Sequence, residues 1–281
     1  MASAASHPLD GPRGKLVRAK QQAALLSKLC DEYAASEPYR LVCRFEGDAQ
    51  YVYLEGAPPP SYLGLILGEM IHDLRAALDQ LAWQLALDHV GEEVLAEPRA
   101  GNAIVFPITS SRENFKAHRA LPYFSVEAQR VMEGRQPYHN DGMALVNPLA
   151  IVQELSNADK HRGLTPSLGQ VRLAELRVRS TVAIDDSMLG FLRPEQSLID
   201  QAEPVLKIPV PESAHIEFEP PAVHVGFLSF AAGVPDVLFH DKLDQLCVQI
   251  AEVVIAFEPA FPPVDWSERT KSWITPGMPG L

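Results

Sequence analysis

The segment 61–87 contains no lysine, and this absence constrains the fold more than any other feature of the chain. Its few charged or titratable residues are Glu69, His72, Asp73, Arg75 and Asp79. Exposed helix faces usually carry lysine and glutamate freely, so we expect a helix that neighbouring elements cover over most of its circumference. Large apolar residues at helical spacing form one face of this helix: Leu63, Leu67, Met70, Leu74, Leu78, Leu81 and Leu85.

The opposite face of this helix is polar. With a turn of about 100° per residue, Glu69, His72, Arg75 and Asp79 fall together there. Small neighbours such as Gly68 indicate that a second element packs closely against this stripe. Arg75 and Asp79 are four residues apart, which is the spacing of a helical salt bridge. Three interpretations stay open: a structural ion network or dimer interface, a pocket or active-site stripe, and a solvated face.

A second helix is expected from Asn147 and Pro148, an N-cap and first-turn pair, to about His161. Glu154 shares a stripe with two polar residues near its end, and the full polar run is Asn157, Asp159, Lys160, His161 and Arg162. Basic residues at a helix C-terminus complement the helix dipole, which gives the run a structural explanation. The functional interpretation is that this stripe faces the first one, with the two helices antiparallel.

The chain as a whole is expected to be α+β, with a helical core followed by a β-rich half that a C-terminal helix covers. Alternation predicts a hairpin from strands Tyr39–Glu46 and Gln50–Glu55 and a strand at Ala103–Ile108. The expected divisions are a disordered leader at 1–14, a helical core with the hairpin at 15–165, a β-rich region with the last helix at 166–258, and a proline-rich tail at 259–281.

Composition narrows the classes of function. The formal charge is −12, from 36 acidic against 24 basic residues, so RNA or nucleotide binding is disfavoured by repulsion of phosphate. The 3 cysteines form no CxxC pair, which is typical of reduced thiols. No apolar run approaches the ~20 residues of a membrane helix, and the N-terminus lacks the apolar core of a signal peptide. We therefore expect a cytoplasmic protein that does not bind membranes.

One resemblance is carried by four segments in a fixed order. The sequence IHDLRAALDQLAW (Ile71–Trp83) is followed by FPI (Phe106–Ile108), QPY (Gln136–Tyr138) and DKHR (Asp159–Arg162). This pattern is similar to one found in many uncharacterised bacterial proteins. It brings no assigned function.

Within the pattern lies a weaker resemblance to the HEPN superfamily, helical bundles that include metal-independent ribonucleases. The family pattern places a histidine after an arginine with four to six residues between them. Here Arg75 matches the arginine, but Gln80 occupies the histidine position. Glutamine cannot act as an acid or base, so the resemblance implies a degenerate relative of RNA-acting proteins. His72, His161 and Asp79 complete the set of catalytic candidates around Arg75.

Two other hypotheses come from different classes. Glu69-x-x-His72 has the spacing of helical metal ligands, so a divalent metal could be held by residues from both helices: Glu69, His72, Asp79, Glu154 and His161. The protein would then be a metal-dependent enzyme on a small organic substrate. Alternatively it is a structural or oligomeric partner protein, and self-association is expected under the first hypothesis as well.

Overall fold

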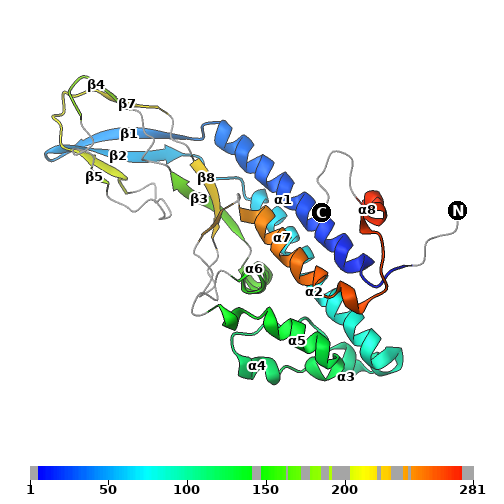
Figure 1. Cartoon of the computed structure of the whole chain (residues 1–281). Helices are drawn as coiled ribbons and strands as arrows, with labels where there is room; N and C mark the ends of the chain where they lie inside the picture. The colour runs from blue at the N-terminus through cyan, green and yellow to red at the C-terminus, as the bar shows by residue number, and fades with distance from the viewer. Residues whose placement is uncertain are drawn as a thin grey trace.

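The computed structural model describes residues 6–140, 147–162, 164–171, 178–184, 190–191, 203–219, 223–228, 237–239 and 242–273. Long helices form the core of this part of the chain (Figure 1): α1 (Asp10–Ala35), α2 (Tyr62–Leu95), α6 (Pro148–Arg162) and α7 (Leu243–Ile255). Helix α1 packs along α2, and α7 contacts both of them. Helix α6 packs against α2 and α7, so α2 has neighbours on several sides.

The apolar face expected for the first helix is confirmed in α2. Leu63, Leu67 and Met70 are fully buried, and the remaining leucines of that face are at most 4% exposed. Full burial of one such side chain contributes about 1.5–3 kcal/mol, so this face is a major source of stability. Gly91 interrupts this helix: its φ and ψ of 79° and 168° are non-helical, and a short helical segment follows the kink as far as Leu95.

The strands form small antiparallel sheets, and the largest has the order β1-β2-β6-β5. Its strands are β1 (Tyr39–Glu46), β2 (Ala49–Gly56), β6 (Leu206–Ile208) and β5 (Gly190–Phe191). The predicted hairpin is confirmed, since Tyr39 pairs with Gly56 and Glu46 with Ala49. This sheet encloses a second apolar core around Val52, Leu54 and Ile208, and it lies beyond the end of α1 in Figure 1.

The other strands complete the β-rich half. Strand β3 (Thr165–Val171) pairs with β8 (Val223–Leu228), which pairs with β9 (Val237–Phe239). Strand β4 (Val178–Ser180) pairs with β7 (Ile216–Phe218). The expected fold class, α+β with a C-terminal helix, is confirmed, but α7 packs mainly on α1, α2 and α6 of the helical core instead of covering the β-rich half. In the described ranges, no helix is both long and apolar enough to cross a membrane.

Short helices connect α2 to α6: α3 (Pro98–Gly101), α4 (Arg112–Lys116) and α5 (Val126–Gly134). The strand expected at Ala103–Ile108 is wrong, because this segment forms no ladder. It runs as an extended loop beside α2, where side chains rather than a neighbouring strand bond its backbone. Its apolar residues, Phe106 above all, fill the helical core instead.

The predicted disordered leader is wrong for residues 6–14, because α1 begins at Asp10 and Leu9 is fully buried. The C-terminal segment holds this end in place. Arg269 in α8 (Trp266–Arg269) forms an ion pair with Asp10, and the guanidinium of Arg13 lies 4.1 Å above the Trp266 ring. Part of the proline-rich tail therefore wraps against the start of α1, as Figure 1 shows.

Candidate functional site

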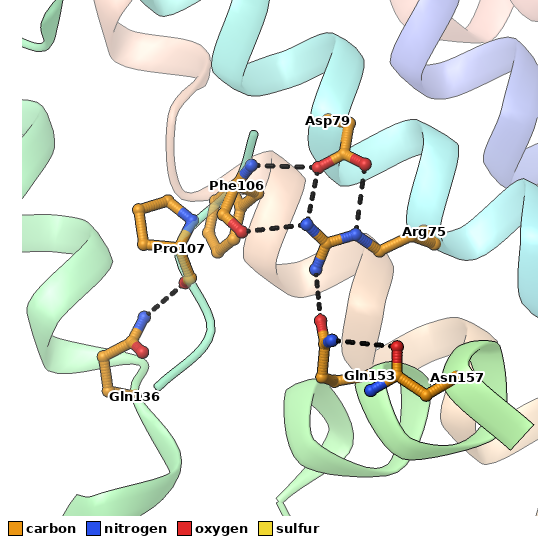
Figure 2. A network of polar contacts seen from close by, with 7 residues as sticks. All are labelled: Arg75, Asp79, Phe106, Pro107, Gln136, Gln153 and Asn157. Carbon is orange, nitrogen blue, oxygen red and sulfur yellow. Dashed lines mark hydrogen bonds and ion pairs between the residues drawn. The ribbon is translucent and has the colours of Figure 1, made fainter. Parts of the chain in front are cut away.

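Arg75 is the centre of a polar network between α2, α6 and the 106–108 loop (Figure 2). Its Nε and Nη2 donate to the Asp79 carboxylate at 3.1 and 2.8 Å, which confirms the predicted salt bridge. Its Nη1 donates to Gln153 Oε1 at 2.8 Å, and Nη2 also donates to the carbonyl of Phe106 at 3.1 Å. Asp79 in turn accepts the backbone N–H of Phe106 at 2.9 Å.

A second side chain fixes the same loop from the other side. Gln136 is fully buried, and its amide donates to the carbonyls of Pro107 and Met132 at 2.8 and 3.1 Å. Its Oε1 accepts the backbone N–H of Thr109 at 2.9 Å. The FPI and QPY segments of the sequence pattern therefore meet through a hydrogen bond from the Gln136 side chain to the Pro107 backbone.

This network gives Arg75 a structural role. The side chain is only 14% exposed, and each of its three nitrogens donates to a group of the chain itself. Hydrogen bonds to charged groups are stronger than neutral ones, so the network ties the loop and α6 to α2. A guanidinium held in this way has little capacity left for a substrate.

A separate cleft of about 570 Å³ opens between α1, α2 and α6. We call it the α1–α2–α6 cleft. Its lining combines cations, carboxylates and one imidazole: Lys15, Arg18, Leu65, Gly68, Glu69, His72, Asp73 and Asp159. Glu69 and His72, from the predicted polar stripe, are both exposed here, whereas Arg75 and Asp79 face the network instead. The predicted stripe is thus divided between two sites.

Asp73 forms the floor of the cleft, with a side chain only 3% exposed. Lys15 Nζ donates to its Oδ1 at 2.6 Å, and Arg18 Nε lies 3.0 Å from its Oδ2 as an ion pair without hydrogen-bond geometry. A buried carboxylate needs such partners, because an unpaired buried charge is strongly destabilising. The pairing explains why two basic residues of α1 lie over α2.

The other two carboxylates of the cleft have no cation beside them. Glu69 accepts the amide of Gln22 at 2.9 Å. Asp159 is half-buried against α2, where a Cβ on Gly68 would lie 2.6 Å from its Oδ1, so this close approach requires the glycine. Among the described residues, neither Asp159 nor His72 has a hydrogen-bond or ion-pair partner. The cleft therefore presents to the solvent two carboxylates that have no ion-pair partner among the described residues.

The predicted site residues of α6 are scattered. Asn157, Lys160 and His161 are exposed, and Asn157 accepts only a long bond of 3.4 Å from Gln153. Glu154 is half-buried and does not line the cleft. Arg162 ends the helix. Of the whole run, only Asp159 joins residues of α2 in the cleft.

The predicted metal centre is not assembled. In the part of the chain that the structure describes, no three His, Cys, Asp or Glu side chains are grouped to hold a metal ion. All five proposed ligands lie in that part. Asp79 belongs to the Arg75 network, and His161 is exposed to solvent. The set was inferred from a shared stripe, but the stripe faces two different environments.

Sequence reasoning missed Asp73, Lys15 and Arg18 as site residues. A signal for Asp73 was present, because it lies between Met70 and Leu74 on the edge of the apolar face. A carboxylate at such a position needs a cation, and the basic residues of the first helix were the available partners. Gln136 gave no comparable signal, since its partners are mostly backbone groups. Gln153 gave none either, since it meets Arg75 only through the packing of α6 on α2.

The two residues that carry the HEPN resemblance do not share a site. Arg75 contacts α6 and the 106–108 loop, whereas the Gln80 amide lies against Gly11 at the start of α1. Comparisons of the chain with models of protein families, with curated proteins and with solved structures gave no match. The resemblance therefore stays a prediction.

Proposed function

We propose that this protein is a binding protein whose ligand site is the α1–α2–α6 cleft, and that the ligand is a small organic molecule carrying a protonated amine. The observation that carries the proposal is Asp159, a half-buried carboxylate without a partner among the described residues. Glu69 and His72 are exposed at the same cleft. An ammonium group donates up to three hydrogen bonds, which suits separated carboxylate acceptors.

The charge of the site favours a cation over an anion. The lining carries three carboxylates against Lys15 and Arg18, and both of these cations already contact Asp73. The chain as a whole has a formal charge of −12. Clefts lined by an excess of one sign concentrate ligands of the opposite sign, so an amine is drawn to this site and a free phosphate is not.

The lining also favours binding of an organic cation over covalent catalysis. Among the described lining residues none carries a hydroxyl or thiol, so no serine, threonine, tyrosine or cysteine nucleophile is present there, and the amine of Lys15 is held by Asp73. Carboxylates that are not grouped tightly enough for a metal ion can still accept from an ammonium group. Leu65, which is 72% exposed, offers apolar contact to the carbon skeleton of such a ligand.

The proposal is tested by thermal unfolding in the presence of putrescine, sodium acetate or magnesium chloride. A ligand that binds only the folded state raises Tm, and the stabilisation grows with the logarithm of its excess over Kd. We expect putrescine to raise Tm and acetate to leave it unchanged. The variants Glu69→Gln and Asp159→Asn should abolish the putrescine effect, and Glu113→Gln, an exposed acid on α4, should retain it. An equal shift in all variants would show that putrescine acts elsewhere.

Self-association is the second candidate, because the exposed face of α2 has coiled-coil spacing. Positions separated alternately by three and four residues form the seam: Tyr62, Leu65, Glu69, His72, Ala76, Asp79 and Trp83. Tyr62, Leu65 and Trp83 are 48%, 72% and 37% exposed. Sedimentation equilibrium should show a dimer that Leu65→Lys dissociates and Val126→Lys does not; a monomeric wild-type chain would exclude this candidate.

A further inference from the structure

A groove of about 500 Å³ continues from the cleft along α1 towards its start. It is lined by Asp10, Gly11, Gly14, Lys15, Arg18, Gln80 and Trp273. Lys15 and Arg18 line both the groove and the cleft, so the two depressions meet at this pair of cations. A ligand held in the cleft therefore has room to extend past them.

Gly14 is the residue of this groove that the fold does not explain. It lies inside α1, where glycine is less favourable than alanine, and a Cβ at this position would meet no atom of the described chain within 4 Å. Gly11 differs, because a Cβ there would lie 2.6 Å from Gln80 Oε1. A helical glycine beside open space suits the close approach of a ligand.

The walls on either side of Gly14 define the chemistry of that ligand. Trp273 supplies a half-buried aromatic ring, against which a flat ring can pack. Arg18 is 63% exposed and contacts Asp73 through Nε, which leaves its two terminal nitrogens without a partner among the described residues. Asp10 adds no free negative charge, because it is paired with Arg269. The groove thus offers a stacking surface next to an available cation.

We propose that the ligand is an aromatic zwitterion, of the chemical class of the aromatic amino acids. Its ring packs over Gly14 against Trp273, its carboxylate binds the free nitrogens of Arg18, and its ammonium group binds Asp159 and Glu69 in the cleft. This inference rests on the proposed function, which assigns the ammonium group to the cleft. It adds a ring subsite and an anion subsite to that assignment.

The test is calorimetric titration with four probes: L-tryptophan, tryptamine, indole-3-propionate and L-alanine. L-tryptophan should bind most tightly. Removal of its ring, as in L-alanine, should weaken binding about two- to tenfold, the range expected for an aromatic contact. Removal of the carboxylate or the ammonium group should each weaken binding about tenfold or more, since each loses a charge-assisted hydrogen bond.

Two glycine variants provide a matched pair. Gly14→Leu should fill the groove and weaken L-tryptophan binding to the level of L-alanine without lowering Tm. Gly134→Leu, at the end of α5 with equally open surroundings, should leave L-tryptophan binding unchanged. If L-tryptophan binds no more tightly than L-alanine, or Gly14→Leu has no effect, the ring subsite is wrong while amine binding still stands. If no amine binds, both proposals fail.

Discussion

Arg75 and Asp79 lie one turn apart on α2 and are joined by two hydrogen bonds, of 3.1 and 2.8 Å, from the guanidinium to both carboxylate oxygens. Both residues also bond the backbone of Phe106, whose carbonyl and N–H are thereby satisfied. The pair therefore bonds backbone groups of this loop that a neighbouring strand would bond in a sheet. It is a structural element that joins this loop to α2.

Arg75→Ala should lower the free energy of unfolding by ~2–4 kcal/mol, because it leaves Asp79 and the Phe106 carbonyl without their donors. The control is Arg130→Ala, which removes an exposed pair with Glu127 on α5 and should change stability by less than ~1 kcal/mol. Urea unfolding of both variants measures the difference. Equal, small effects would show that the Arg75 network is an ordinary surface feature.

Gln136→Leu should destabilise the protein by ~2–4 kcal/mol through loss of buried hydrogen bonds. The leucine keeps the volume but leaves the Pro107 carbonyl and the Thr109 N–H without their side-chain partner, whereas the Met132 carbonyl retains the N–H of Arg135. Gln245→Leu, an exposed site on α7, is the control and should be close to neutral. If urea unfolding gives the two variants the same stability, Gln136 does not hold the loop in the way described.

We predict no robust ribonuclease activity. The chain has glutamine where the HEPN pattern has histidine, and general acid–base catalysis contributes about 10²–10⁴-fold. The structure sharpens this prediction, because Gln80 contacts the start of α1 and Arg75 contacts α6. Gln80→His should therefore stay inactive too. Incubation with structured RNA checks both; cleavage by the wild type that Arg75→Ala abolishes would contradict the structural role of Arg75.

His118 should make stability depend on pH. Burial, and to a smaller extent Arg119 and Arg75, lower the pKa of this imidazole in the folded state. The unfolded chain, with a pKa of about 6.5, then takes up a proton first. Stability is fully present above that pH and declines as pH falls towards the lowered folded pKa. Urea unfolding from about pH 7.5 to about pH 5.5 should show a shallower loss for His118→Gln than for wild type; identical slopes would exclude this contribution.

Much of the helical core could be predicted from the sequence, because periodicity reports burial directly. The leucines from Leu63 to Leu85 repeat at helical spacing, and all of them pack inside. The hairpin could also be predicted, because alternation and the Gly47-Asp48 turn fix its register. Close packing beside Gly68 was also anticipated, and Asp159 of α6 fills that position.

The rest depended on tertiary contacts that periodicity does not encode. The sequence of residues 103–108 predicts a strand, but none of the described strands pairs with them, and side chains bond the loop instead. Residues 10–14 were predicted to be part of a disordered leader because they contain proline and glycine. Contacts with Arg269 and Trp266, which are distant in sequence, hold these residues in a helix. The packing of α1 places Lys15 and Arg18 on Asp73. The cleft that they line is therefore a separate site from the Arg75 network.

The central claim is that the α1–α2–α6 cleft binds an amine, and calorimetric titration of putrescine tests it most directly. Wild type and Glu113→Gln should bind with the same Kd. Asp159→Asn keeps the shape of the side chain but removes its negative charge. The loss of a charge-assisted hydrogen bond costs about 1.5–3 kcal/mol, so binding should weaken about 10- to 150-fold. An unchanged Kd in Asp159→Asn, or no binding by the wild type, would contradict the account.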